Sequence, residues 1–492
     1  MHLGKVFFPG FLVIALSLIL IPVSAQVASE TPAVAFPFIR QDLNGFIYQE
    51  QGLDRFYAQL QRLELKQRRT VNIVHIGDSH LQADFFSGAF RQMMHKRFGA
   101  AGRGLVFPFK LAHTNSPADI KSFSNTDWEV KRNVSPSKSL PIGISGITLR
   151  TSDPNFSLQL SLGSNGGNLD YHFNKVTIFN EKGPACYSFL LSEADDYPKP
   201  EKSSEYNEKY HIVESGESVA LLSRRYHVSI DQLRKWNHLK NDLIYPKQKV
   251  IVYRSSAVKE MEQPIEYTEL ARIDNSYQNE NSYSTTVFLD HLVKSVYLRG
   301  EKTAETQSRA TLYGIVLEND TQQGILYHMI GVNGAMFRHY NATPNFFPQV
   351  RELHPDLIIV SLGTNESSGE TFNEKWFYDH VNRMISTLRL QVPYADILLM
   401  TPSDAYRGRK FENPNAGKAK DVLLRYGQEH KLSVWNFYEV MGGFGAIDEW
   451  YRNGLAQRDR LHLTRMGYKL QGQLLYGALM NGYEDFLSNG TR

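Results

Sequence analysis

The residue types needed for nucleophilic catalysis stand near opposite ends of the sequence. Ser79 lies in Gly77-Asp78-Ser79-His80, and His462 closes Asp459-Arg460-Leu461-His462. A carboxylate three residues before a histidine can accept its Nδ1–H, which leaves Nε2 free to take a proton from a serine. These residues predict a Ser79–His462–Asp459 triad. Taken singly, the first motif could be a helix cap and the second a surface carboxylate followed by a solvated histidine.

A serine nucleophile also needs donors for the oxyanion that forms on the attacked carbonyl. The Ser79 backbone N–H stands at the start of a predicted helix, where N–H groups are unpaired. Gly334, within Gly331-Val332-Asn333-Gly334-Ala335, lets the backbone approach a ligand and present its N–H. Asn365, within Gly363-Thr364-Asn365-Glu366, can aim its amide into a pocket. We predict Ser79, Gly334 and Asn365 as the oxyanion donors, although each motif alone could be an ordinary turn.

Secondary structure predicted around these residues would position them. Residues 71–76 are short, apolar and β-branched, which predicts a buried strand that ends at Gly77. Apolar residues at helical spacing follow from Phe85 to Phe98. The segment 77–84 therefore joins a strand to a helix, at the edge where open α/β sheets place their chemistry.

The same alternation returns in the last third of the chain. Apolar runs predict strands, and amphipathic stretches predict the helices between them. The strands are expected at 357–362, 397–400 and 432–437, and the helices at about 376–390, 416–430 and 463–480. Strands that alternate with helices predict a parallel sheet covered on both faces.

The middle of the chain follows a different pattern. Short alternating segments from about 122 to 191, and again from about 267 to 316, are typical of a β-sandwich or jelly roll. Between them, residues 208–253 indicate a compact strand–helix–helix–strand unit with polar, charged linkers beside it. The predicted β domain is therefore split in sequence.

The order of the catalytic motifs resembles the SGNH (GDSL-type) hydrolase family. The matches are Gly77-Asp78-Ser79, Gly334, Gly363-Thr364-Asn365 and Asp459-Arg460-Leu461-His462, and they cover roughly 70–110 and 325–485. The resemblance implies a flavodoxin-like three-layer α/β/α fold and ester hydrolysis by a serine. Two positions depart from the common pattern: Glu366 stands where many relatives carry aspartate, and His80 where leucine is commoner.

The unit in the middle resembles the LysM module. Its matching segments are Tyr210-His211-Ile212-Val213, Gly216-Glu217-Ser218, Leu221 to Tyr226, Leu233 to Asn237 and Leu243 to Val250. LysM modules bind polymers that contain N-acetylglucosamine, so the resemblance implies glycan contacts, which we assign to Gly216, Glu217, Ser218, Ile244 and Tyr245. Relatives usually carry Asp-Thr instead of Glu217-Ser218, and either pair can cap the first helix. A DNA-binding helix-turn-helix is the alternative, which export of the chain would disfavour.

A third resemblance is to bacterial peptidoglycan O-acetylesterases. It rests on the Gly-Asp-Ser-His block, a β-rich insertion before Gly-Val-Asn-Gly-Ala, and the closing Asp-Arg-Leu-His-Leu-Thr. It implies an insertion similar to carbohydrate-binding sandwiches and removal of O-acetyl groups from peptidoglycan through an acyl-enzyme. A LysM module inside the insertion departs from that pattern. Three alternatives stay open: O-acetyl transfer with the same triad, an acetylesterase on another exported polysaccharide, and a wall-binding scaffold without catalysis.

The first 25 residues predict export. Lys5, an apolar run from Val6 to Ile21 and the small residues Val23-Ser24-Ala25 are typical of a cleaved signal peptide. An uncleaved membrane anchor is disfavoured because the run is short and contains Pro9 and Gly10. The single cysteine, Cys186, excludes an internal disulfide, which fits a bacterial envelope. We expect a periplasmic or cell-envelope protein without stable membrane insertion after cleavage.

Composition restricts the partners. A formal net charge of +3 gives no argument for a nucleic acid, whose partners usually carry a basic patch. No cysteine and histidine cluster suggests a metal, and the proposed chemistry needs no cofactor. Peptidoglycan or another polymer containing N-acetylglucosamine is the expected partner, and the oligomeric state is left open.

Together these observations predict an α/β protein of several units. A signal peptide over 1–25 precedes an SGNH hydrolase domain split into 26–110 and 325–492. The β-sandwich insertion is expected over 111–205 and 255–324, and a βααβ LysM module over 206–254.

Overall fold

The computed structural model describes residues 36–47, 52–137, 139–163, 171–193, 206–226, 228–239, 241–256, 265–277 and 283–489. The predicted signal peptide, residues 1–25, lies outside these ranges. Among the helices they contain, none combines the length and the apolar character that a membrane span needs.

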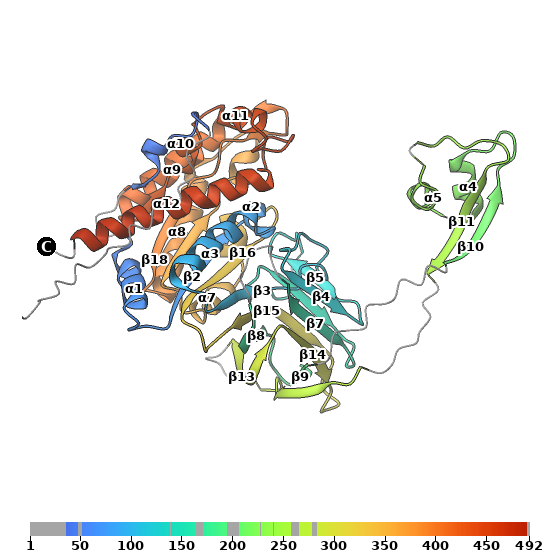
Figure 1. The fold of residues 1–492 in the computed structure, drawn as a ribbon, viewed down its shortest axis with the longest axis horizontal. Coiled ribbons are helices and arrows are strands. Elements are labelled where there is room, and N and C mark those ends of the chain that lie inside the picture. The colour runs from blue at the N-terminus through green and yellow to red at the C-terminus, as the bar shows by residue number, and fades with distance from the viewer. Residues whose placement is uncertain are drawn as a thin grey trace, which may run out of the picture.

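A six-stranded sheet forms the centre of the largest unit (Figure 1), with the order β1-β21-β18-β17-β2-β16. The strands are β1 (Phe46–Ile47), β2 (Thr70–Gly77), β16 (Gly324–Gly331), β17 (Leu357–Ser361), β18 (Asp396–Met400) and β21 (Ser433–Trp435). Every neighbouring pair is parallel except β1 with β21. The strands are almost continuously buried, as expected for a parallel sheet covered on both faces.

Two groups of helices pack in this unit. The first group, α1 with α3 and α12, packs together, and so does the second, α6 and α7 with α8 and α9. The helices are α1 (Asp54–Glu64), α2 (Ser79–Gln82), α3 (Phe85–Phe98), α6 (Phe337–Asn341), α7 (Phe346–Arg351), α8 (Glu374–Gln391), α9 (Pro414–His430), α10 (Phe437–Val440), α11 (Ala446–Arg452) and α12 (Arg465–Asn489). Short 3₁₀ turns, η1 (Gln41–Leu43) and η2 (Glu366–Ser368), and a small hairpin of β19 (Tyr406–Arg407) with β20 (Phe411–Glu412) complete it.

Two antiparallel sheets form the inserted unit. One has the order β12-β9-β14-β7-β4, and the other runs β13-β8-β15-β6-β5 with β3 added on β15. The strands are β3 (Gly102–Val106), β4 (Ile120–Ser124), β5 (Glu129–Arg132), β6 (Ile147–Thr151), β7 (Ser157–Leu162), β8 (Phe173–Asn180), β9 (Ser188–Glu193), β12 (Thr268–Ile273), β13 (Ser284–Val293), β14 (Ser295–Glu301) and β15 (Ala310–Glu318). Each sheet mixes strands from both sides of the 206–256 segment, so the two halves of the insertion form one body.

The segment between the halves forms a small unit with its own core. Strand β10 (Tyr206–Ile212) pairs antiparallel with β11 (Lys249–Ser256), and α4 (Val219–Tyr226) and α5 (Ile230–Trp236) lie between them in sequence. The core residues are Val213, Val219, Leu222, Leu233, Val250 and Val252. The mixed α/β class and the βααβ order predicted from the sequence are both confirmed.

Candidate active site

Three parallel strands bring the predicted site residues to one edge of the large sheet. Gly77 at the end of β2 is in register with Gly331 of β16 on one side and with Ser361 of β17 on the other. The turns that follow these strands carry Ser79, Gly334 and Asn365. Segments far apart in the sequence therefore meet at the carboxyl edge, as the strand–helix alternation predicts.

Ser79 begins the short helix α2 directly after a crowded turn. Asp78 is the N-cap, and its Oδ1 accepts the His80 N–H at 3.0 Å. Gly77 has no room for a side chain, because a Cβ there would lie 2.6 Å from the Ser361 Oγ and 2.7 Å from the Leu81 Cδ1. Because Asp78 supplies the cap, the Ser79 hydroxyl is left for another partner.

That partner is His462. The Ser79 Oγ lies 3.1 Å from the His462 Nε2, and the His462 Nδ1 lies 2.9 Å from the Asp459 Oδ2. The other carboxylate oxygen of Asp459 accepts the backbone N–H groups of Leu461 and His462, each at 3.1 Å. The structure thus brings the three predicted residues together, with Nδ1 facing a carboxylate and Nε2 facing the hydroxyl.

The electrostatics favour an ionised Asp459. Burial alone would raise the pKa of Asp459, but hydrogen bonds from the His462 ring and from two backbone N–H groups outweigh it and hold the pKa below its ordinary value. The carboxylate can therefore orient the imidazole and stabilise its protonated form.

A second contact set, which the sequence did not reveal, holds the turn that carries Asp459 and His462. Arg460 has a positive φ of 48°. Its Nε lies 2.5 Å from the Asp448 Oδ1, and its guanidinium packs against the rings of Tyr406 and Tyr451. Tyr406 also donates its backbone N–H to the Arg460 carbonyl at 2.7 Å and its hydroxyl to Asp448 at 2.8 Å. No sequence pattern links these residues.

The turn around Gly334 presents one available N–H group. Gly334 has a φ of +79° and open space beside its Cα. The neighbouring backbone N–H groups are all accepted: Asn333 by the Gln82 Oε1 (2.7 Å), Ala335 by the Val332 carbonyl (3.0 Å), Met336 by the His339 Nδ1 (3.0 Å) and Phe337 by the Glu366 Oε1 (2.7 Å). Within the described part of the chain, the N–H groups of Gly334 and Ser79 have no acceptor. Two of the three predicted oxyanion donors are therefore unengaged.

Asn365 is differently placed from what the motif alone implies. Its Nδ2 donates to the Asp78 Oδ2 at 3.2 Å and to the Ala335 carbonyl at 2.9 Å. Both amide hydrogens thus have protein acceptors, and Asn365 ties the Ser79 turn to the Gly334 turn. Its role as an oxyanion donor stays a prediction.

Buried titratable groups surround these turns. Burial raises the pKa of Asp78 to about 7 and that of Glu366 to about 8, so both carboxyl groups hold protons more readily than in water. Burial lowers the pKa of His80 to about 3, which keeps its ring neutral. The His80 ring centroid lies 5.4 Å from that of His462, and its Nδ1 lies 2.9 Å from the Tyr468 hydroxyl. A protonated His462 ring is therefore not repelled by a positive charge on His80.

Gln82, which sequence reasoning missed, links the site to the insertion. Its side chain is fully buried. Its Nε2 donates to the Thr114 Oγ1 at 2.5 Å and to the Asn115 carbonyl at 3.3 Å, while its Oε1 accepts the Asn333 N–H. A glutamine beside a catalytic motif carries no signal of its own, because only the folded chain shows which N–H it meets.

The predicted glycan contacts of the βααβ unit separate into two groups. Gly216 and Tyr245 lie at the surface, and Tyr245 is 65% exposed. Ser218 accepts the Leu221 N–H at 3.2 Å as a helix cap, and Ile244 packs against the small core. Glu217 points inward. Hydrogen bonds from the Glu214 N–H and the His211 ring, and an ion pair with Arg225, lower the pKa of Glu217 to about 2.

No metal cluster accompanies these residues in the described ranges, since no three His, Cys, Asp or Glu side chains are grouped to hold an ion. The arrangement of Ser79, His462 and Asp459 is one that can activate a serine for acyl chemistry.

Comparison with known families gives two domain matches. Residues 302–470 match the model of the GDSL-like lipase/acylhydrolase family, and residues 211–252 match that of the LysM domain. The first match contains Gly334, Asn365, Asp459 and His462 but not Ser79. A search of curated proteins gave no match.

Solved structures give the fold. A structure described as a peptidoglycan O-acetylesterase in action is similar with a TM-score of 0.60 and 16% identity, covering 90% of this chain and 98% of that one. A lipase/acylhydrolase from Enterococcus faecalis (21% identity, TM-score 0.26) covers 32% of this chain and 77% of that one. A carbohydrate esterase family 3 protein from Talaromyces cellulolyticus (15% identity, TM-score 0.27) covers 33% of this chain and 75% of that one. The first of these structures shares its fold with this chain.

Proposed function

We propose that this chain, a carboxylic ester hydrolase containing a GDSL-like acylhydrolase domain and a LysM domain, removes O-acetyl groups from peptidoglycan with Ser79 as nucleophile. One observation carries the proposal. The Ser79 Oγ lies 3.1 Å from the His462 Nε2, and the His462 Nδ1 lies 2.9 Å from the Asp459 Oδ2. The three side chains therefore form a continuous chain of hydrogen bonds. Two unengaged backbone N–H groups, those of Ser79 and Gly334, lie in the turns at the same sheet edge.

The first half of the reaction forms an acyl-enzyme. The His462 Nε2 takes the proton of the Ser79 hydroxyl while Oγ forms a bond to the acetyl carbonyl carbon. The negative charge that develops on the carbonyl oxygen is stabilised by the Ser79 and Gly334 N–H groups. As the tetrahedral intermediate collapses, His462 gives the proton to the sugar oxygen, which leaves as a hydroxyl.

The second half releases acetate. His462 takes a proton from a water molecule, whose oxygen attacks the acetyl-serine carbonyl through the same oxyanion site. The Ser79 oxygen then leaves and regains its proton from His462. Asp459 stays ionised throughout because its hydrogen bonds hold its pKa low.

Asn365 joins as the third donor if its amide exchanges one acceptor for the substrate oxygen. The longer of its two bonds, 3.2 Å to Asp78, is the one we propose to be given up. A protonated Asp78 loses least from this exchange, and burial raises the pKa of Asp78 to about 7. Losing one such donor typically costs on the order of a hundredfold or more in rate.

The LysM domain supports a glycan substrate. We propose that the surface around Gly216, Ser218 and Tyr245 contacts a polymer containing N-acetylglucosamine, with Ile244 shaping the groove and Glu217 supporting it from inside. Binding there would keep the triad near its substrate and raise the effective concentration without new chemistry. A signal peptide over 1–25 would deliver the chain to the periplasm or cell envelope.

Release of acetate from O-acetylated peptidoglycan tests the proposal. The wild-type chain should release acetate, and Ser79→Ala should release none above background while remaining folded. A small acetyl ester is assayed beside it. Turnover of the small ester without release from peptidoglycan would keep the triad and overturn the substrate, pointing to acetyl transfer or another polysaccharide. No turnover of either would overturn the esterase proposal.

A further inference from the structure

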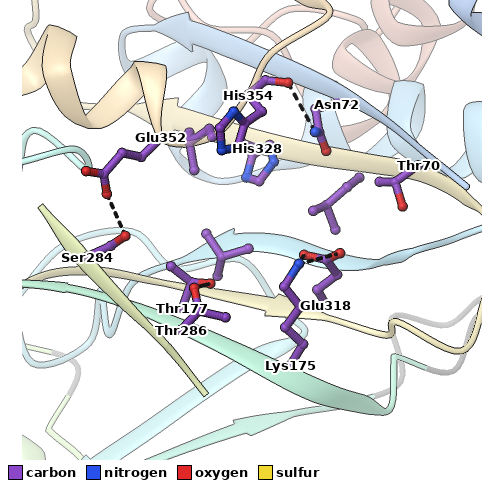
Figure 2. A pocket seen from close by; sticks show the side chains of 13 residues that line it. Thr70, Asn72, Lys175, Thr177, Ser284, Thr286, Glu318, His328, Glu352 and His354 are labelled. Atoms are coloured by element: carbon purple, nitrogen blue, oxygen red, sulfur yellow. Dashed lines mark hydrogen bonds and ion pairs between the residues drawn. The ribbon is translucent and has the colours of Figure 1, made fainter. Parts of the chain in front are cut away.

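A cavity lies between the large sheet and the insertion, away from Ser79. It has a volume of about 440 Å³ and is lined by the amino-terminal halves of β2 and β16, by residues after α7, and by β8, β13 and β15. We call it the junction cavity (Figure 2). Strand β2 has eight residues, so its two ends are roughly 20 Å apart. Thr70 at the cavity end and Ser79 beyond the other end therefore belong to separate sites.

The wall contributed by the large sheet has unmet hydrogen-bonding capacity. His328 is 1% exposed, and neither of its ring nitrogens has a partner among the described residues; the Oδ1 of Asn72 has none either. Buried polar groups are almost always paired, because leaving one without a partner is destabilising. Asn72 and His328 lie on the same face of the sheet, because Asn72 is in register with Leu326.

The chemistry of this wall selects a ligand that both donates and accepts hydrogen bonds. Burial lowers the pKa of His328 to about 3, so its ring is neutral and offers one N–H donor and one acceptor. The Asn72 Oδ1 is only an acceptor. A simple anion has no proton for Asn72, and a simple cation has no lone pair for His328. Hydroxyl groups satisfy both.

The opposite wall offers hydroxyl groups and one ion pair. The Thr177 and Thr286 hydroxyls lie 2.8 Å apart, and Lys175 is paired with Glu318 at 3.0 Å. Glu352 at the rim already accepts the Tyr283 N–H and the Ser284 hydroxyl. Figure 2 shows His328 and His354 on one side of the space and the two threonines and the ion pair on the other. The one lysine of the lining is paired, and the remaining carboxylate, Glu352, would repel an anion, so the cavity favours an uncharged polar ligand.

From these features we infer that the junction cavity binds one uncharged sugar residue, held between Asn72 and His328 on one wall and the Thr177–Thr286 pair on the other. The volume lies within the range of small-molecule sites. This inference goes beyond the proposed function and does not depend on Ser79. A sugar bound there would bridge the insertion and the hydrolase sheet, because each supplies one wall.

The test uses the full mature chain labelled with ¹⁵N in its histidine rings and titrated with N-acetylglucosamine. Comparison with His328→Gln assigns the His328 resonances. These resonances report on the cavity, and those of the LysM histidines report separately on that domain. The His328 resonances should shift saturably at millimolar sugar. The double variant Thr177→Val with Thr286→Val should bind about fivefold more weakly or worse, since two hydroxyl hydrogen bonds are lost. Thr285→Val, one residue away on the same strand but outside the cavity lining, is the matched control and should bind normally.

Three outcomes would overturn the inference. His328 resonances that do not move up to roughly 100 mM sugar would mean that no such site exists. An unchanged titration in the double valine variant would remove the threonine wall from the site. The same shifts with sodium phosphate in place of sugar would show general ion binding. Turnover of a small acetyl ester should be the same in all variants, so failure here is distinguishable from failure of the esterase proposal.

Discussion

The side-chain oxygen of Gln82 accepts the backbone N–H of Asn333 at 2.7 Å, one residue before Gly334. Gln82 follows Ser79 on the same short helix, so this bond sets the spacing between the nucleophile and the Gly334 N–H. Replacing Gln82 by Leu should reduce kcat on a small acetyl ester by about tenfold, less than the full loss of an oxyanion donor, with little change in KM.

Gln349→Leu is the matched control for this variant. Gln349 is also buried and accepts a backbone N–H, that of Ile144, at 2.6 Å, whereas the N–H groups of the Gly334 turn have other acceptors. It should lose comparable stability and keep its kcat. Equal kcat losses in both variants would show that Gln82 acts only through stability.

Asp459→Asn should leave the fold intact and lower kcat by about a thousandfold or more on any acetyl ester. A neutral amide cannot stabilise the protonated His462 ring, and its NH₂ group can favour the wrong tautomer. Thermal unfolding and kcat measured together check this. Near-normal turnover would show that another group orients His462.

The left-handed backbone of Arg460 can be tested with two substitutions that remove the same contacts. Arg460→Gly and Arg460→Ala both lose the Asp448 pair and the two tyrosine rings. Only alanine is strained at a φ of 48°, so the glycine variant should be more stable by about 1 kcal/mol. Chemical unfolding compares the stability of the two variants. A more stable alanine variant would contradict the left-handed backbone at this position.

The raised pKa of Glu366 predicts a particular pH dependence of stability. Because its folded-state pKa, about 8, lies above the value of roughly 4.3 in an unfolded chain, the unfolded state loses its proton first as pH rises. Glu366 therefore lowers stability progressively between about pH 5 and pH 8. Glu366→Gln should gain stability relative to wild type as pH rises through that window. Denaturant titrations at several pH values measure this. A stability difference between Glu366→Gln and wild type that stays constant across the window would contradict the raised pKa of Glu366.

Excising residues 208–253 should weaken retention on insoluble peptidoglycan and spare turnover of a small acetyl ester. Strands β10 and β11 are antiparallel, with Tyr206 paired to Ser256, so the cut ends lie side by side. Tyr245→Ala in the intact chain should reproduce part of the retention loss. Loss of small-ester turnover on excision would mean that the hydrolase needs the module for folding.

Much of this arrangement could be predicted from the sequence, for identifiable reasons. The periodic strands and helices beside Ser79 and Asn365 gave the parallel sheet, and the ordered motifs gave the GDSL-type hydrolase and the LysM domain, both confirmed by family matches. The strands of the large sheet end within two residues of the prediction, whereas β3, which joins the insertion, lies inside the range 26–110 predicted for the hydrolase domain. The last helix, expected over 463–480, runs from Arg465 to Asn489. It continues past the stop signal Asn481-Gly482 because Gly482 and the buried Tyr483 pack against Tyr57.

Long-range polar contacts could not be predicted. Gln82 meets Asn333, and Arg460 meets Asp448, through side chains that have no periodicity and no motif. The inward position of Glu217 is of the same kind, because its partners His211 and Arg225 become visible only in the folded module. The junction cavity depends on two units packing together, which no local pattern encodes.

The position of β2 in the sheet has a consequence for how the chain reaches its active form. Both neighbours of β2, the strands β16 and β17, are synthesised only after the whole insertion and the LysM domain. Contacts between segments so distant in sequence form slowly. Ser79 can gain its His462 partner only when nearly the entire polypeptide has been made. A chain that stops before His462 is therefore expected to be inactive rather than partly active, because it lacks the base for Ser79.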